Sequence, residues 1–222
     1  MYLQKLLLSP LVCDLFFTFG ENLRYNMQKL ISCLLVISVL STMNAQDDKS
    51  IPYIEIPAAP EHYKSGNVVA RMIDGLGYRY HWATKELRQE DLEYRPSEDA
   101  KTTAETLEHL YGLSLTILNG AKSLPNIRPS KQPDKSWEAL RVATLQNFKE
   151  ASDLMRGKKA KNLAKLKIIF QRGERKSEFP YWNMLNGPIA DAIYHTGQIV
   201  AFRRASGNPI DGRVNVFRGK NN

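Results

Sequence analysis

Cysteine is scarce in this chain: the 222 residues contain two, Cys13 and Cys33, and both lie near the N-terminus. Both precede Ala45, which ends a small-residue cleavage motif after an apolar run from Leu30 to Leu40. A chain processed after Ala45 contains no cysteine. Processing at this point therefore excludes a structural disulfide, a thiolate nucleophile and a Cys-rich zinc site.

Long apolar runs are also missing. The run from Leu30 to Leu40 is shorter than the roughly 20 residues that a membrane-spanning helix needs. With Met27 as the translation start and Lys29 as a charged n-region, it is typical of a secretory signal peptide. We therefore predict that residues 1–45 are an N-terminal extension plus signal peptide, and that the product is secreted or periplasmic. The alternative is that residues 1–26, which contain a second apolar patch, act as an extended signal or an N-terminal anchor.

Acidic residues are outnumbered by basic ones, and the formal net charge is +8. Much of the excess lies in residues 156–167, which read RGKKAKNLAKLK. Such a run could bind nucleic acid or anionic lipid. No aromatic residue is interleaved with these basic residues, however, and the protein is predicted to be exported. We therefore interpret the run as a solvated connector and expect no nucleic-acid partner.

Helical periodicity dominates the rest of the chain. Thr102 and Glu105 form a capping box, and apolar residues recur at helical spacing in four segments. The predicted helices cover about 67–87, 102–122, 137–155 and 180–205. Residues 166–179 are predicted to form a short extended or hairpin-like insert, too small for a sheet. The expected fold is an all-α four-helix bundle over residues 66–210, with an irregular lead at 46–65 and a tail at 211–222.

Asp191 and His195 stand four residues apart in the last predicted helix, so their side chains share one face. A carboxylate and an imidazole at this spacing are typical of metal ligands, although the two groups could also simply pair with each other. Gln198 lies on the same face as an outer-shell partner or substrate contact. His109 lies in the second predicted helix. His81, near the end of the first, is a reserve ligand.

Three segments carry a recognisable combination of motifs: residues 83–96 (ATKELRQEDLEYRP), residues 103–110 (TAETLEHL), and residues 195–199 (HTGQI) followed by Arg203, Arg204 and Gly207. The first two resemble the first half, and the third the second half, of the DinB/YfiT-like superfamily, a group of proposed metal-dependent enzymes. The resemblance covers roughly residues 67–209. It implies an up-down-down-up bundle, often dimeric, with a divalent metal held by one histidine from the second helix and two from the fourth.

This resemblance places His109 and His195 on two ligand positions and puts Asp191 where the superfamily has a histidine. Two histidines and one carboxylate hold zinc in some hydrolases and iron in non-haem enzymes. We therefore expect one divalent ion, with zinc, nickel, iron and manganese not distinguished.

The expected function is metal-dependent hydrolysis of a small molecule by an exported homodimer. Tyr194 and Trp182 are predicted to line the substrate cavity beside the metal. Arg203 is predicted to steady an anionic group of the substrate. An alternative is a non-catalytic bundle in the cell envelope with a degraded metal site, which binds a small ligand or a partner. Thiol-dependent transfer and an accessory role in DNA damage, which the resemblance also suggests, are disfavoured by export.

Overall fold

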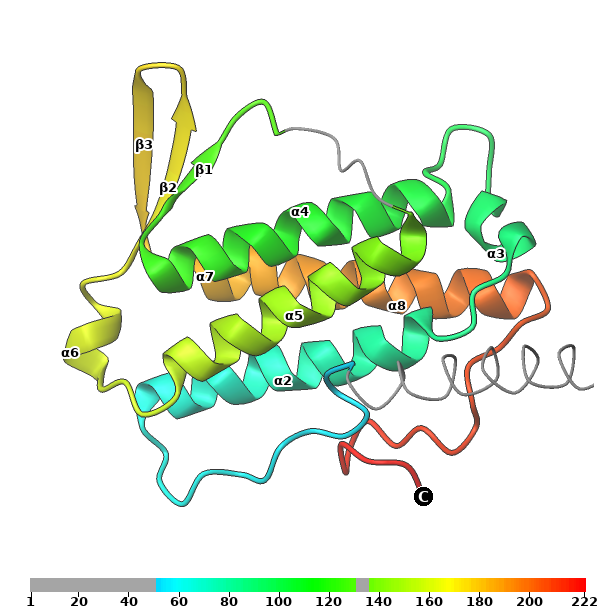
Figure 1. Ribbon diagram of the computed structural model, residues 1–222, viewed down its shortest axis with the longest axis horizontal. Coiled ribbons are helices and arrows are strands. Elements are labelled where there is room, and N and C mark those ends of the chain that lie inside the picture. The colour runs from blue at the N-terminus through cyan, green and yellow to red at the C-terminus, as the bar shows by residue number, and fades with distance from the viewer. Residues whose placement is uncertain (1–50, 131–135) are drawn as a thin grey trace, which may run out of the picture. The chain divides into compact units, whose positions relative to one another are not determined.

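Four long helices dominate the computed structural model, which describes residues 51–130 and 136–222 (Figure 1). These helices are α2 (Ser65–Thr84), α4 (Thr103–Lys122), α5 (Trp137–Met155) and α8 (Ala190–Ala205). The prediction of a mostly helical protein is therefore confirmed. The predicted start at Met27, the signal peptide, its cleavage site and both cysteines lie outside the described residues.

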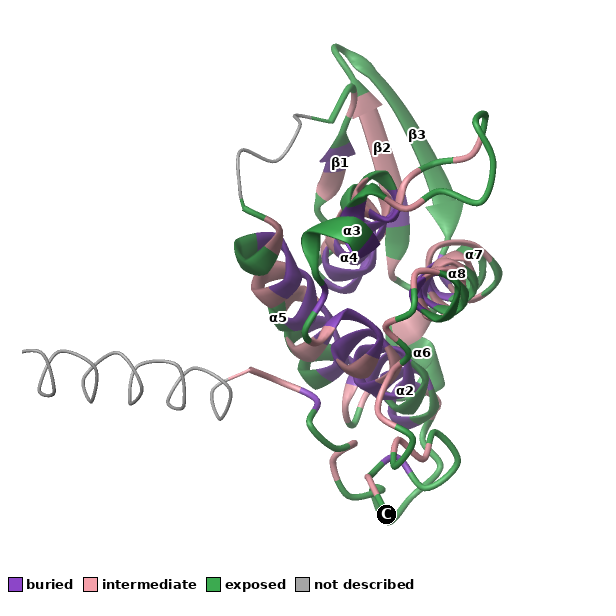
Figure 2. Cartoon of the chain, turned by 90° about the vertical axis from the view of Figure 1, so that its right-hand side faces the viewer, coloured by how far each residue is buried: buried purple, intermediate pink, exposed green. Residues whose placement is uncertain are grey.

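The four helices enclose one hydrophobic core. Helix α5 packs on α2 and α4, and α8 packs on the same two helices. Figure 2 shows their buried sides facing one another. Tyr80 and Phe148 meet edge to face at the centre, with ring centroids 5.9 Å apart. The buried core residues all lie between Tyr53 and Ile199. Because the compact unit Ile51–Asn222 contains this whole core, we expect it to fold without the first 50 residues.

Local sequence signals account for the ends of α4. The Glu105 N–H donates to Thr102 Oγ1 at 3.1 Å, and the Thr102 N–H donates to Glu105 Oε2 at 2.7 Å. This reciprocal pair is the capping box expected from the sequence. At the other end Ser123 takes a left-handed conformation, with φ of 55°, which ends the helix. The cap fixes where α4 begins, and thereby the turn on which His109 lies.

A small sheet corrects one prediction. Strands β2 (Lys167–Arg172) and β3 (Arg175–Pro180) form the expected antiparallel hairpin. A third strand, β1 (Pro125–Ile127), pairs with β2 in parallel, with Asn126 opposite Phe170. The prediction that this insert is too small for a sheet was therefore wrong. Strand β1 is three residues long and starts at a proline, so no local pattern marks it. Its partner lies more than forty residues away in the sequence.

The predicted fourth helix is interrupted. It consists of α7 (Trp182–Met184), a π-turn η1 (Leu185–Ile189) and α8. Gly187 has a non-helical backbone, and Pro188 follows it inside the turn. Proline has no N–H and crowds the preceding turn, so a π-turn accommodates it at low cost. The partly buried Ile193 and Val200 of α8 pack against the core.

The lead and the tail cover the outer side of α2. The Trp82 indole N–H donates to Ile54 O at 3.1 Å, and Tyr78 donates to Asn221 Oδ1 at 2.8 Å. A Cβ on Gly77 would lie 2.4 Å from the ring of Tyr53, so only glycine allows the lead this close approach. Within the described ranges, no helix has both the length and the apolar character needed for a membrane span.

Two shorter helices complete the described elements: α3 (Gln89–Glu93) and α6 (Ala160–Leu163). Helix α3 lies where the sequence suggested only a break after the first helix. The first long helix ends at Thr84 instead of near residue 87, because Glu86 takes a positive φ of 58°. Helix α6 lies within the basic segment 156–167, at the end of the bundle where α5 ends and α2 begins (Figure 1).

Candidate metal centre

The packing of α4 against α8 brings His109 beside Asp191 and His195. The Nε2 atom of His109 lies 3.3 Å from Asp191 Oδ2, and the Nε2 atom of His195 lies 3.3 Å from Asp191 Oδ1. The two imidazole rings stand almost perpendicular, at 86°, with centroids 4.6 Å apart. In the part of the chain that the structure describes, these three side chains form the one group of His, Cys, Asp or Glu residues with ligand atoms all within 4.8 Å.

The distances are compatible with a shared ion as well as with a direct hydrogen bond between His109 and Asp191. Hydrogen bonds between a charged donor and a carboxylate are typically about 2.7–2.9 Å long. The 3.3 Å separations between the Asp191 oxygens and the imidazole nitrogens are longer than this. A tetrahedral ion with bonds of about 2.1 Å keeps neighbouring ligand atoms about 3.4 Å apart. The residues present therefore fit a divalent metal, and the aspartate is compatible with that geometry.

The surroundings favour the metal-binding form of His109. Burial lowers the pKa of His109, the neighbouring His195 lowers it further, and Asp191 opposes both effects in part. A lowered pKa keeps the imidazole neutral near pH 7, and the neutral ring has a lone pair for a metal. Neutral His109 can therefore bind a metal near pH 7 without first losing a proton.

Gln198 orients His195. Its Oε1 atom lies 2.7 Å from His195 Nδ1, and its Nε2 atom lies 3.4 Å from the Tyr194 hydroxyl. An amide oxygen only accepts hydrogen bonds, so His195 Nδ1 carries the proton. The lone pair then resides on Nε2, the atom that faces Asp191. The outer-shell position predicted for Gln198 matches this contact.

The cluster is partly open to solvent. The side-chain exposures are 42% for Asp191, 35% for His109 and 18% for His195. A cleft of about 820 Å³ adjoins the cluster between α4 and β1, and His109 lines it together with Glu108, Thr116 and Arg128. Water or a small molecule in this cleft can therefore reach His109, whereas Asp191 and His195 do not line it.

Of the other site residues predicted from the sequence, some lie near the three ligands and others do not. Tyr194 is exposed, and its ring lies 5.2 Å from the His195 ring, at the edge of the cluster. Trp182 lines a different, apolar cavity at the end of the bundle. His81 is buried outside the cluster, and its Nδ1 donates to Pro52 O at 2.8 Å. The structure thus brings Tyr194 and Gln198 to the three ligands and places Trp182 and His81 elsewhere.

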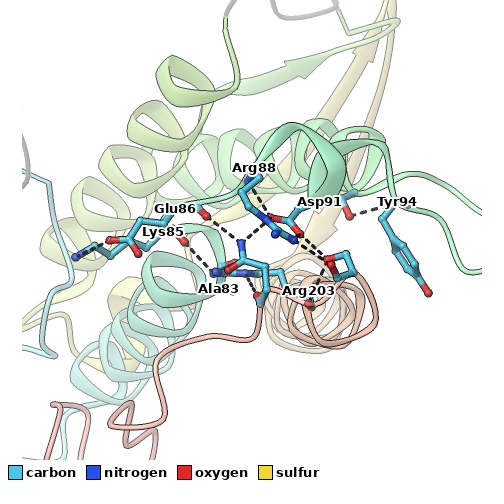
Figure 3. Close-up of polar contacts among 10 residues, drawn as sticks. Ala83, Lys85, Glu86, Arg88, Asp91, Tyr94 and Arg203 are labelled. Atoms are coloured by element: carbon cyan, nitrogen blue, oxygen red, sulfur yellow. Dashed lines mark hydrogen bonds and ion pairs between the residues drawn. The ribbon is translucent and has the colours of Figure 1, made fainter.

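Arg203 is engaged with the backbone at the C-terminal end of α2 (Figure 3). It is buried, and its Nη1 donates to the carbonyls of Ala83 at 3.3 Å and Lys85 at 2.8 Å. The same atom donates to Trp82 O at 3.3 Å, and Nε donates to Asn208 O at 2.8 Å. The guanidinium therefore joins α8 to the end of α2. The structure gives Arg203 a structural position, and its contact with a bound anion stays a prediction.

Asp91 occupies the centre of the same network, which the sequence reasoning did not identify. Burial alone raises the pKa of Asp91, but hydrogen bonds from Arg88, Ser206 and Asn208 outweigh it and hold the pKa well below its usual range. The Asn208 amide donates to Asp91 Oδ2 at 2.6 Å, and Arg88 donates to Oδ1 at 2.9 Å. The available signal was the three-residue spacing of Arg88 and Asp91 in segment 83–96, one of the segments that carries the resemblance.

Comparison with protein-family models finds no match for this chain, and comparison with curated proteins finds none. Among solved structures, a DinB-like protein (YjoA) from Bacillus subtilis is similar, with a TM-score of 0.49 and 12% sequence identity. The alignment covers 63% of this chain and 92% of that chain. A likeness at this level identifies no function.

Proposed function

We propose that this protein is an exported DinB-like metal-dependent hydrolase that binds one divalent ion through His109, Asp191 and His195. The observation that supports it best is the convergence of two imidazole Nε2 atoms, from two different helices, on one carboxylate at 3.3 Å. When bound, a divalent ion in such a set acidifies water or polarises a substrate oxygen.

Gln198, Asp191 and Tyr194 have different roles in the proposed site. Gln198 holds the proton of His195 at Nδ1 and keeps Nε2 available. Asp191 supplies one negative charge, which offsets half the charge of a divalent ion. Its partly exposed carboxylate also marks the side from which a substrate would approach. Tyr194 lies at this edge and can donate a hydrogen bond to a substrate oxygen.

We propose the up-down-down-up order for the four long helices. The contacts of α2 and α4 with both α5 and α8 support it. The course of the chain also supports it, because α2 and α8 run in one direction in Figure 1 and α4 and α5 in the other. The homodimer stays a prediction. Light scattering tests it, and a strictly monomeric mass would contradict it.

Metal analysis is the first experiment. Residues 46–222, purified without a metal-binding tag, are expected to carry about one divalent ion per chain by mass spectrometry. His109→Ala and Asp191→Ala should abolish this ion. His62→Ala should keep it, because His62 lies in the exposed lead outside the cluster.

Hydrolysis is then assayed with the metal that loads, on ester, amide and phosphoester substrates. Activity should disappear with a chelator and in both ligand variants. A wild-type protein that stays empty after incubation with zinc, nickel, iron and manganese would overturn the metal proposal. It would leave the second hypothesis, a non-catalytic bundle that binds a small ligand or partner.

Export rests on the N-terminal pattern and is tested separately. The mature protein in an envelope fraction should begin at Gln46. An intact N-terminus in the cytoplasmic fraction would contradict both the cleavage site and the predicted secreted or periplasmic location.

A further inference from the structure

An apolar cavity of about 600 Å³ lies at the end of the bundle that carries α6. Its lining includes Tyr63 from the lead, Val68 from α2, Leu163 from α6 and the segment Tyr181–Trp182. None of the three metal-ligand candidates lines it. The cavity is therefore a separate feature of the molecule, independent of the proposed hydrolase.

Large apolar side chains around this cavity face solvent. Trp182 is 77% exposed, Tyr63 97% and Val68 46%. Exposed aromatic side chains beside an open apolar cavity mark an interaction surface, because a packed protein normally buries such groups.

Three lysines are neighbours in sequence of residues that line this cavity. Lys64 stands between the lining residues Tyr63 and Ser65, Lys161 follows Ala160, and Lys165 follows Ala164. All three lysines are exposed, and no ion pair to any of them occurs within residues 51–130 and 136–222. Segment 156–167 contains no acidic residue. Basic side chains therefore stand next to the cavity lining in both the lead and the α6 segment.

The fold thus supplies what the basic segment lacks in sequence. No aromatic residue is interleaved with its lysines. In the tertiary structure, however, Tyr63, which precedes this segment in the sequence, and Trp182, which follows it, line the same cavity. We propose that this end of the protein docks on the surface of an anionic phospholipid membrane. The lysines contact phosphate head groups, Trp182 and Tyr63 insert at the interface, and the cavity accommodates part of an acyl chain.

Charge and shape favour a membrane over other anions. Three unpaired lysines on two chain segments suit an extended anionic surface, whereas one small carboxylate needs only one or two donors. Aromatic rings with a polar edge prefer the interface between head groups and acyl chains. Stable attachment of a peripheral protein needs two signals, and here basic and apolar contacts occur together.

Co-sedimentation with vesicles tests the proposal. Residues 46–222 are expected to bind vesicles in which about a third of the lipid is phosphatidylglycerol, and to bind phosphatidylcholine vesicles weakly. Replacing Lys161 and Lys165 together by glutamine should lower the partition coefficient roughly 30-fold. The matched control replaces Lys101 and Lys220, two exposed lysines outside the cavity lining, and should change it little.

A second pair of variants tests the apolar part. Trp182→Ala should reduce binding several-fold and remove the blue shift of tryptophan emission that vesicles cause. Phe217→Ala, which removes a 97% exposed ring from the tail, should do neither. Thermal unfolding of each variant shows that the fold is kept.

Three results would overturn the proposal. One is equal binding to neutral and anionic vesicles, and another is an equal loss in the control pairs. The third is the absence of vesicle binding, with saturable binding of laurate or of a single-stranded oligonucleotide in its place. Laurate binding would indicate a site for a single anionic amphiphile, and oligonucleotide binding a nucleic-acid surface.

Discussion

Arg203 provides the sharpest test of the structure, because its position differs from the role that the sequence suggested. Arg203→Ala removes a buried guanidinium that serves four carbonyl groups, with its shortest bonds, 2.8 Å each, to Lys85 O and Asn208 O. Each hydrogen bond from a charged donor contributes about 1.5–3 kcal/mol, and the sum is less than additive. We expect the free energy of unfolding to fall by about 3–4 kcal/mol.

Thermal unfolding of residues 46–222 measures this loss. For a domain of this size each kcal/mol corresponds to about 2–4 °C, so Tm should fall by roughly 6–16 °C. The metal content should stay unchanged, because Arg203 contacts none of the three candidate ligands. Arg203→Lys keeps the charge but offers fewer fixed donors, so its Tm should lie between those of the wild type and the alanine variant.

Arg204→Ala is the matched control. Arg204 is the exposed neighbour, and its loss should change stability by less than about 0.5 kcal/mol. If Arg203→Ala unfolds at the wild-type temperature but loses affinity for an anionic substrate, the structural interpretation is refuted and the sequence-based one is right.

Three further predictions concern the metal ligands, the lead and the acid limit of stability. Gln198→Leu should weaken metal binding about 10- to 100-fold in a chelator competition, because the imidazole proton loses its acceptor; unchanged affinity would contradict this orienting role. Gly77→Ala should lower the free energy of unfolding by about 1–3 kcal/mol through overpacking, as measured in urea. Gly112→Ala, with nothing within 4 Å of its new Cβ, should raise it by up to about 1 kcal/mol. The pKa of Asp91 is lower in the folded than in the unfolded state, so its stabilisation is full above about pH 5 and is lost as the pH falls. Asp91→Asn should therefore lower Tm at pH 7 and flatten its decline between about pH 5 and pH 2; a parallel decline in both proteins would contradict this.

Short-range signals in the sequence correctly indicated several elements. The capping box of Thr102 and Glu105 and the end of α4 at Lys122 lie where the sequence placed them. The third helix, predicted after the loop that ends at Asp134 and before Gly157, is α5 (Trp137–Met155). These features depend on residues within one or two turns, where side-chain periodicity and backbone capping decide the conformation. The same local rule puts Asp191 and His195 on one face of α8.

The contacts between distant residues were decided by tertiary packing alone. His109 and Asp191 are 82 residues apart, and only the packing of α4 on α8 sets their 3.3 Å separation. Sequence motifs suggested which histidine to choose, but they did not indicate that Arg203 caps α2. Nor did they show that Tyr63 and Trp182 lie beside the lysines of α6.

By itself, then, the sequence determined the approximate course of the four long helices, the capping box of α4 and the shared face of Asp191 and His195, because local hydrogen bonding and periodicity act within a few residues. The tertiary structure decided the distance from His109 to Asp191, the pairing of the parallel strand β1 and the backbone contacts of Arg203. It also decided the position of the apolar cavity near the lysines of segment 156–167. Burial and packing between segments far apart in the chain produce these features, and no short stretch of residues encodes them.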